Sequence, residues 1–134
     1  MSKNILTRPY KRKESDLRKA LKKLWQSWGM FVQNIESGSV ELGIPDCFVS
    51  YARGFAWIEL KSIAAPARKT TLITPGLSDE QIAWALKFKK NKTLVGAWFL
   101  VVQVGEELFY STVPRKKYKR TELKKWDNFL KELN

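Results

Sequence analysis

The sequence predicts an α/β protein in which helices flank one mixed β-sheet, and three features lead to this fold class. Apolar residues between Leu17 and Trp28 recur at the spacing of one helical face. The stretch GIPDCFVSYARGFAWIELKS, residues 43–62, reads as two strands joined by a short turn. Residues 96–104 are almost continuously apolar, which is typical of a central strand covered on both faces. Helices and strands that follow one another in this way favour layers packed around one sheet.

The elements are expected in the order helix, three strands, helix, two strands, helix (αβββαββα). Helices are predicted over residues 14–28, 78–90 and 121–133. Strands are predicted over residues 30–35, 46–51, 55–63, 96–104 and 107–113. Gly29 marks the end of the first helix, and Ser78 with Gln81 forms the capping-box pattern that opens the second. Residues 1–13 are interpreted as a basic N-terminal arm and residues 14–134 as a single domain.

The charge of the chain predicts a polyanionic partner. Its 134 residues include 25 Lys and Arg but only 13 Asp and Glu, which gives a formal net charge of +12. Fifteen of the basic residues lie in two segments, 8–23 and 115–125. Contact with phosphate explains such clusters better than a merely solvated surface does. Nucleic acid is favoured over a membrane surface because the sequence has no lipidation motif.

Hydropathy and cysteine content indicate where the protein is located and exclude some kinds of site. The longest apolar run, residues 96–102, is far too short to span a bilayer, and the N-terminus lacks the apolar core of a signal peptide. The single Cys47 excludes an internal disulfide, and the lack of histidine excludes a Cys/His zinc site. Without a histidine partner, Cys47 is interpreted as a small buried apolar residue. The protein is therefore expected to be soluble and cytoplasmic.

Three charged residues in the strand-like stretch are the candidates for chemistry. Asp46 begins one predicted strand, and Glu59 and Lys61 lie on one face of the next, because side chains alternate along a strand. In a hairpin, Asp46 can approach Glu59 at the end far from the turn. Two carboxylates suit Mg²⁺, which lowers the pKa of bound water and stabilises charge on a phosphodiester. A structural ion pair with a spectator acid is the alternative that this pattern leaves open.

These residues also resemble a known family. The segments Gly43-Ile44-Pro45-Asp46, Ile58-Glu59-Leu60-Lys61 and Leu77-Ser78-x-x-Gln81 resemble the signature of the PD-(D/E)XK nuclease superfamily, in particular its VRR-NUC branch and the related Holliday-junction resolvases. The similarity extends from about residue 14 to residue 104. It implies a restriction-endonuclease-like core in which Asp46, Glu59 and the backbone carbonyl of Leu60 hold Mg²⁺ or Mn²⁺. It also implies that Lys61 positions or activates the attacking water.

The resemblance suggests three further site residues, and two of them also have a simpler explanation. An acidic residue is expected on the first helix, and Glu14 lies toward the apolar stripe, whereas Asp16 points away from it. Glu14 would equally favour the positive end of the helix dipole. Gln81 is expected either in the active site or only as the capping-box partner of Ser78. Ser37 is a candidate DNA contact because resolvase-like relatives carry a Ser-Gly segment there.

Together these features predict a Mg²⁺-dependent endodeoxyribonuclease that selects branched DNA, such as flaps or Holliday junctions. No zinc finger or basic zipper is present, so recognition of backbone shape is favoured over base readout. A homodimer is implied by the relatives alone. The candidate DNA contacts are Arg8, Lys11, Arg12, Ser37, Arg68, Lys69, Arg115, Lys116 and Lys117. A restriction-like or homing-type endonuclease and a non-catalytic nucleic-acid-binding protein are the alternatives.

Overall fold

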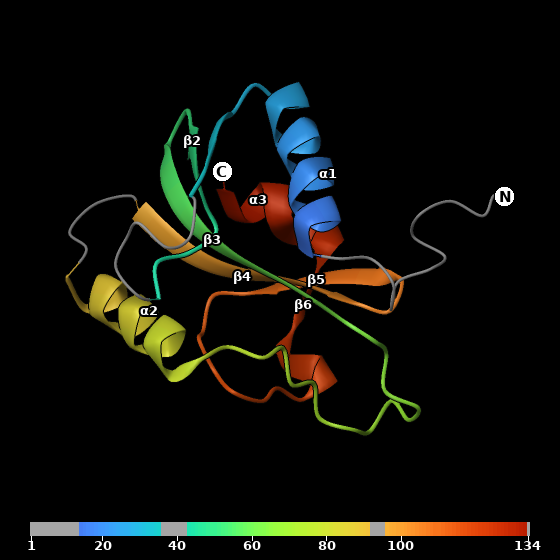
Figure 1. Cartoon of the computed structure of the whole chain (residues 1–134). Coiled ribbons are helices and arrows are strands. Elements are labelled where there is room, and N and C mark those ends of the chain that lie inside the picture. Colours follow the sequence, from blue (N-terminus) through green and yellow to red (C-terminus); the bar gives the residue numbers. More distant parts are fainter. Residues whose placement is uncertain (1–13, 36–42, 92–95, 134) are drawn as a thin grey trace, which may run out of the picture.

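The computed structural model describes residues 14–35, 43–91 and 96–133. Its centre is a six-stranded sheet in the order β1-β2-β3-β4-β5-β6 (Figure 1). The strands are β1 (Phe31–Asn34), β2 (Cys47–Tyr51), β3 (Gly54–Ile63), β4 (Gly96–Val104), β5 (Glu107–Ser111) and β6 (Lys124–Lys125). Strands β3 and β4 are parallel, and all other neighbouring pairs are antiparallel. The sheet is therefore mixed, as the sequence predicts.

Helices cover both faces of this sheet. The α-helices are α1 (Glu14–Ser27), α2 (Asp79–Asn91) and α3 (Phe129–Leu133), and two 3₁₀ turns, η3 (Arg120–Glu122) and η4 (Trp126–Asn128), lie near the C-terminus. Figure 1 shows α1 and α3 on one side of the sheet and α2 on the other. The chain passes from β3 through α2 to β4, which is the crossover that parallel neighbours require.

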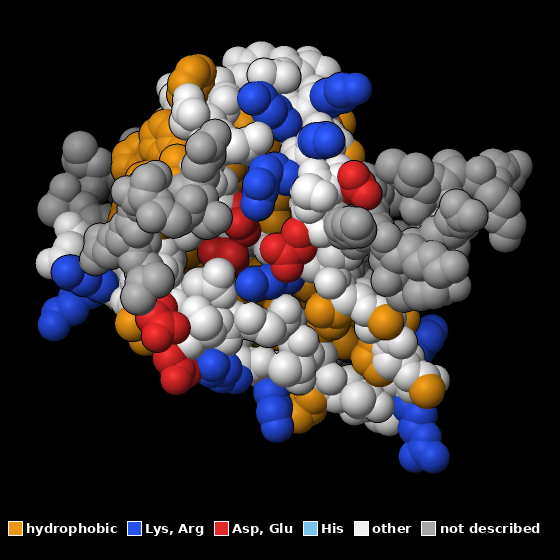
Figure 2. Space-filling model, in the orientation of Figure 1, with side chains coloured by type: hydrophobic (Ala, Val, Ile, Leu, Met, Phe, Trp, Pro, Cys, Tyr) orange, Lys and Arg blue, Asp and Glu red, His pale blue; other side chains and the backbone are white. Residues whose placement is uncertain are grey.

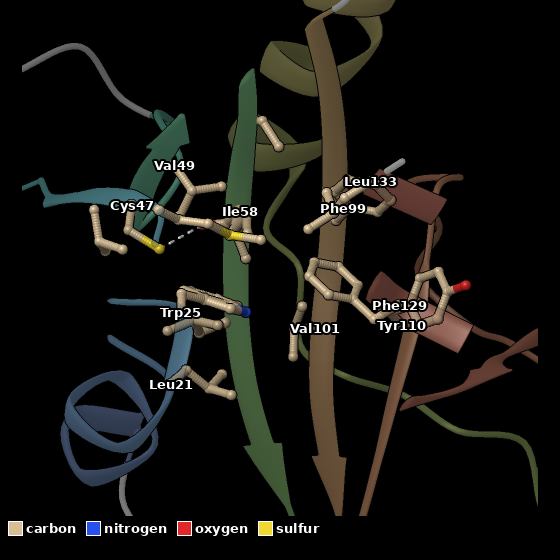
Figure 3. Close-up of a cluster of buried hydrophobic side chains, with 14 of the residues drawn as sticks. Leu21, Trp25, Cys47, Val49, Ile58, Phe99, Val101, Tyr110, Phe129 and Leu133 are labelled. Carbon is tan, nitrogen blue, oxygen red and sulfur yellow. Dashed lines mark hydrogen bonds between the residues drawn. The ribbon is translucent and has the colours of Figure 1, made fainter. Parts of the chain in front are cut away.

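Alternation along β3 separates two hydrophobic cores. On one face Ile58 packs with Trp25 of α1, Phe99 of β4 and Phe129 of α3 (Figure 3). On the other face Trp57 packs against the core that includes α2. Because successive strand residues point to opposite faces, Glu59 emerges on the α2 face, between two residues that belong to the α1 face.

The C-terminal segment corrects the predicted last helix. Helical spacing predicts one helix over residues 121–133, but only Phe129–Leu133 is α-helical. Lys124 pairs with Tyr110 in the short edge strand β6. Leu123, before this strand, is buried in the core on the α2 face, whereas Phe129, after it, is buried in the core on the α1 face. The segment thus crosses from one face of the sheet to the other, which a single helix lying on one face cannot do.

Some predictions fall outside the described residues. Arg8, Lys11 and Arg12 belong to residues 1–13, and Ser37 belongs to residues 36–42. Their roles stay predictions. In the described ranges, no helix combines the length and apolar character needed to cross a membrane.

Candidate active site

The register of the β2–β3 hairpin brings the two candidate carboxylates together. Cys47 pairs with Ile58 in the antiparallel ladder, and the same register places Asp46 opposite Glu59. Oδ2 of Asp46 accepts a hydrogen bond of 2.7 Å from the backbone N–H of Leu60. The Asp46 carboxylate therefore lies against the backbone of β3, beside Glu59, where the ladder between the two strands ends.

Pro45 explains why the ladder ends at this point. Pro45 and Asp46 lie just outside the paired residues of β2, and proline has no N–H to donate to a neighbouring strand. The Leu60 N–H donates instead to the side chain of Asp46. The carboxylate of Asp46 thus takes the place of a backbone carbonyl as the acceptor for the Leu60 N–H.

Glu59 is a buried acid with incomplete partners. Only 2 % of its side chain is exposed, and its Oε2 accepts a 3.0 Å hydrogen bond from Nε2 of Gln81 and lies 3.8 Å from Nζ of Lys61. Its Oε1 is buried without a hydrogen-bond partner among the described residues. Burial, followed by the charge of Asp46, raises the pKa of Glu59 to about 10. A carboxyl buried beside a second acid in this way suits a site that binds a cation.

The N-terminus of α2 positions Gln81 beside Glu59. The Ser78 N–H donates to Oε1 of Gln81 at 2.9 Å, and the Gln81 N–H donates to the Ser78 hydroxyl at 3.1 Å, which is the predicted capping box. Nε2 of Gln81 takes no part in the cap and donates a hydrogen bond to Glu59. Gly43, with φ of +86°, packs against this turn, because an added Cβ would lie 2.2 Å from the Glu80 carbonyl oxygen. Both suggested explanations of Gln81 are therefore compatible with the geometry.

Lys61 and Glu14 complete the cluster. The Lys61 side chain is 14 % exposed, next to Glu59 on the same strand face. Burial is the main cause that raises the pKa of Glu14, and the charges of Lys61, Asp46 and Arg18 all act on it as well. Glu14 thus lies near the two other acids. Figure 2 shows acidic side chains gathered at the centre of one face, with Lys and Arg side chains above them along α1 and below them.

Arg18 is a site residue that the sequence analysis did not single out. Its Nη2 donates to Oδ1 of Asp46 at 3.2 Å, and its Nε is buried without a hydrogen-bond partner among the described residues. Arg18 lies one turn after Glu14, so both side chains project from the same face of α1. This spacing is the signal that could have identified it in the sequence, where it was counted only as part of a basic segment.

The basic candidates near the C-terminus differ in their surroundings. Arg115 pairs with Glu122, and Nζ of Lys116 contacts both the Leu77 carbonyl and Asp79, each at 2.9 Å. Lys117 is exposed and, in the part of the chain that the structure describes, has no ion-pair partner.

The loop after β3 carries the other two basic candidates that the structure describes. Arg68 and Lys69 are exposed there. Their role as DNA contacts stays a prediction.

Cys47 has the environment that the sequence analysis expected. It is buried, and its thiol lies 3.9 Å from the Ile58 carbonyl. Burial, as the largest cause, raises the pKa of the thiol to about 12. A thiol held neutral in this way is a poor nucleophile, so Cys47 belongs to the core and not to the reactive groups.

The acidic side chains of the site supply oxygen donors for a divalent metal. Within the described ranges, no group of three or more His, Cys, Asp or Glu side chains is arranged to hold an ion. Mg²⁺, however, is commonly bound by one or two carboxylates and keeps waters and substrate oxygens as its other ligands. Asp46 and Glu59 supply two carboxylates, and Oε1 of Glu59 is buried without a hydrogen-bond partner in the ranges that the structure describes. The residues therefore fit such an ion.

The chain has a restriction-endonuclease-like fold, with a mixed six-stranded sheet flanked by helices. It matches the structure of Hjc, a Holliday junction resolvase from the archaeal hyperthermophile Archaeoglobus fulgidus. The match has a TM-score of 0.58 and 15 % sequence identity, and it covers 88 % of this chain and 97 % of that chain. Neither a family model nor a curated protein matches the sequence. The predicted fold class is thus confirmed by a structure of very different sequence.

Proposed function

We propose that this protein is a metal-dependent endonuclease that hydrolyses phosphodiester bonds in branched DNA. The observation that carries the proposal is the meeting of Asp46, Glu59 and Lys61 on one face of the sheet in a resolvase-like fold. A satisfied structural ion pair is a poorer explanation, because one oxygen of Glu59 has no partner in the described part of the chain and burial raises the pKa of this carboxyl.

Each residue has a role in this proposal. Asp46 and Glu59 would hold Mg²⁺ or Mn²⁺ together with the backbone carbonyl of Leu60. When bound, the ion lowers the pKa of water and stabilises the charge that builds on the phosphodiester. Lys61, beside Glu59, orients the attacking water, and Gln81 fixes the Glu59 carboxylate. Glu14 adds negative charge to the same cluster.

The exposed basic residues support DNA as the substrate, because they can contact its phosphate backbone. Basic side chains line α1 above the acids in Figure 2. Lys117, Arg68 and Lys69 are exposed, and the basic segment 1–13 carries further charge. Such contacts recognise phosphate and shape but not base sequence. Branched DNA allows several of these groups, or two subunits of a proposed homodimer, to bind backbone at once.

Titration of Mg²⁺ against a four-way junction and a linear duplex of the same sequence tests the proposal. We expect cleavage of the junction at points set by its branching, and no cleavage without the metal. Cleavage of the linear duplex at one fixed sequence would support a restriction-like enzyme instead. Tight binding of both DNAs without cleavage would show a non-catalytic binding protein.

A further inference from the structure

Arg18 holds Asp46 by a contact that is weak for its type. A charge-assisted bond from a guanidinium to a carboxylate is usually 2.7–2.9 Å long and often paired with a second. Here Nη2 of Arg18 donates one bond of 3.2 Å to Oδ1 of Asp46. The buried Nε of Arg18 has no acceptor among the described residues. The guanidinium therefore has donor capacity that the described protein groups do not use.

The same contact occupies the carboxylate that the proposed function assigns to a metal. Oδ2 of Asp46 accepts from the Leu60 N–H and Oδ1 accepts from Arg18, so both oxygens face protein donors. A positive guanidinium at Oδ1 repels a dication that approaches this oxygen. Arg18 is thus a competitor of the metal as long as it stays on Asp46.

Two buried polar atoms of residues next to Asp46 have no hydrogen-bond partner among the described residues. One is the donor Nε of Arg18, and the other is the acceptor Oε1 of Glu59, whose side chain is only 2 % exposed. A phosphodiester supplies an acceptor for the first, and a divalent cation supplies a charge for the second. The side chain of Arg18 is 31 % exposed, so a phosphate can reach part of the guanidinium, whereas the buried Nε becomes accessible only when this group moves.

From these contacts, and resting on the proposed function, we infer that Arg18 is a phosphate-binding residue that couples DNA binding to metal binding. In the free protein, Arg18 covers Asp46. When DNA binds, its guanidinium moves to the phosphate, which it can contact through two parallel N–H bonds. Asp46 is then open to the cation. Because coupling between two ligands is reciprocal, bound metal strengthens DNA binding by the same factor.

The test compares Arg18→Met with Lys19→Met. Lys19 is an exposed residue of the same helix, so its change removes an equal charge at a distance from Asp46. Ca²⁺ serves as the probe because it also takes oxygen ligands. Its affinity is measured by calorimetry for the free protein, and the affinity for a four-way junction is measured by fluorescence anisotropy with and without Ca²⁺. Arg18→Gln is a second neutral variant, and melting curves confirm that each variant is folded.

We expect Ca²⁺ to bind free Arg18→Met about tenfold more tightly than wild type, within the usual range of coupling between sites. The factor by which Ca²⁺ strengthens junction binding falls correspondingly, and Lys19→Met leaves both quantities near wild type. Unchanged Ca²⁺ affinity and coupling in the folded Arg18 variants would overturn the inference while leaving the metal site in place. Failure of wild type to bind Ca²⁺, with or without DNA, would instead overturn the proposed function.

Discussion

Gln81 joins the first turn of α2 to the buried carboxylate of Glu59. Its Oε1 accepts from the Ser78 N–H, while its Nε2 donates to Oε2 of Glu59 at 3.0 Å. One side chain thus connects a helix cap, which stabilises the fold, to an acid in the candidate active site. The two roles are separable by mutation, because Ser78 takes part only in the cap.

We expect Ser78→Ala and Gln81→Ala to differ in their effect on catalysis. Loss of the Ser78 hydroxyl removes one cap bond and lowers the free energy of unfolding by about 1 kcal/mol. Gln81→Ala removes its cap bond and also frees Glu59, so it should lower kcat about tenfold or more. Denaturant unfolding and single-turnover cleavage measure the two effects. Equal kcat values for the two variants would show that Gln81 acts only as a cap.

Asp46→Asn and Glu59→Gln should abolish metal-dependent cleavage while DNA binding persists. Both variants keep the size of the side chain but remove the charge that holds a cation, whereas the basic residues that supply affinity are untouched. Cleavage assays and anisotropy with the same junction check this. Full nuclease activity in either purified variant would contradict the assignment of these acids as ligands.

The raised pKa of Glu59 predicts a stability that falls as pH rises. Below its unfolded pKa, near 4.5, the carboxyl is protonated in both states and has no effect on folding. Between that value and its folded pKa of about 10, the unfolded chain releases a proton that the folded protein retains, so unfolding becomes progressively more favourable. Glu59→Gln should remove this slope. At pH 8 without metal, the variant should be more stable than wild type by at least about 1 kcal/mol, or roughly 3 °C in Tm.

Thermal melts between pH 5 and pH 9 test this prediction, with and without Mg²⁺. Metal should stabilise wild type but not Glu59→Gln, because only the carboxylate favours the cation. A wild-type Tm that stays constant relative to Glu59→Gln across this range would show that Glu59 is not held protonated.

Salt dependence should distinguish Lys117 from Arg115. If about six phosphates are neutralised, the plot of log K against log salt concentration has a slope near −5, at about −0.9 per phosphate. Lys117→Ala should make the slope shallower by about 0.9, equally for all sequences. Arg115→Ala should change it less, because that guanidinium is engaged with Glu122. Anisotropy titrations across salt measure the slopes, and a larger effect of Arg115 would mean that its ion pair opens on DNA.

Much of the fold and the centre of the site could be predicted from the sequence, because both rest on local patterns. Strand periodicity defined the hairpin, and hairpin geometry then placed Asp46 beside Glu59 and left Lys61 on the same face. The capping box of Ser78 and Gln81 was visible for the same reason, since its partners are three residues apart.

Only the tertiary structure decided how distant segments meet. Arg18 and Asp46 are 28 residues apart, and Lys116 and Leu77 are 39 residues apart. Neither contact could therefore be predicted from the spacing of residues in the sequence. The predicted last helix was wrong for a related reason. Helical spacing identifies which residues are apolar, but the face of the sheet that each one covers depends on packing. Leu123 and Phe129 enter different cores, and the edge strand between them carries the chain from one face to the other.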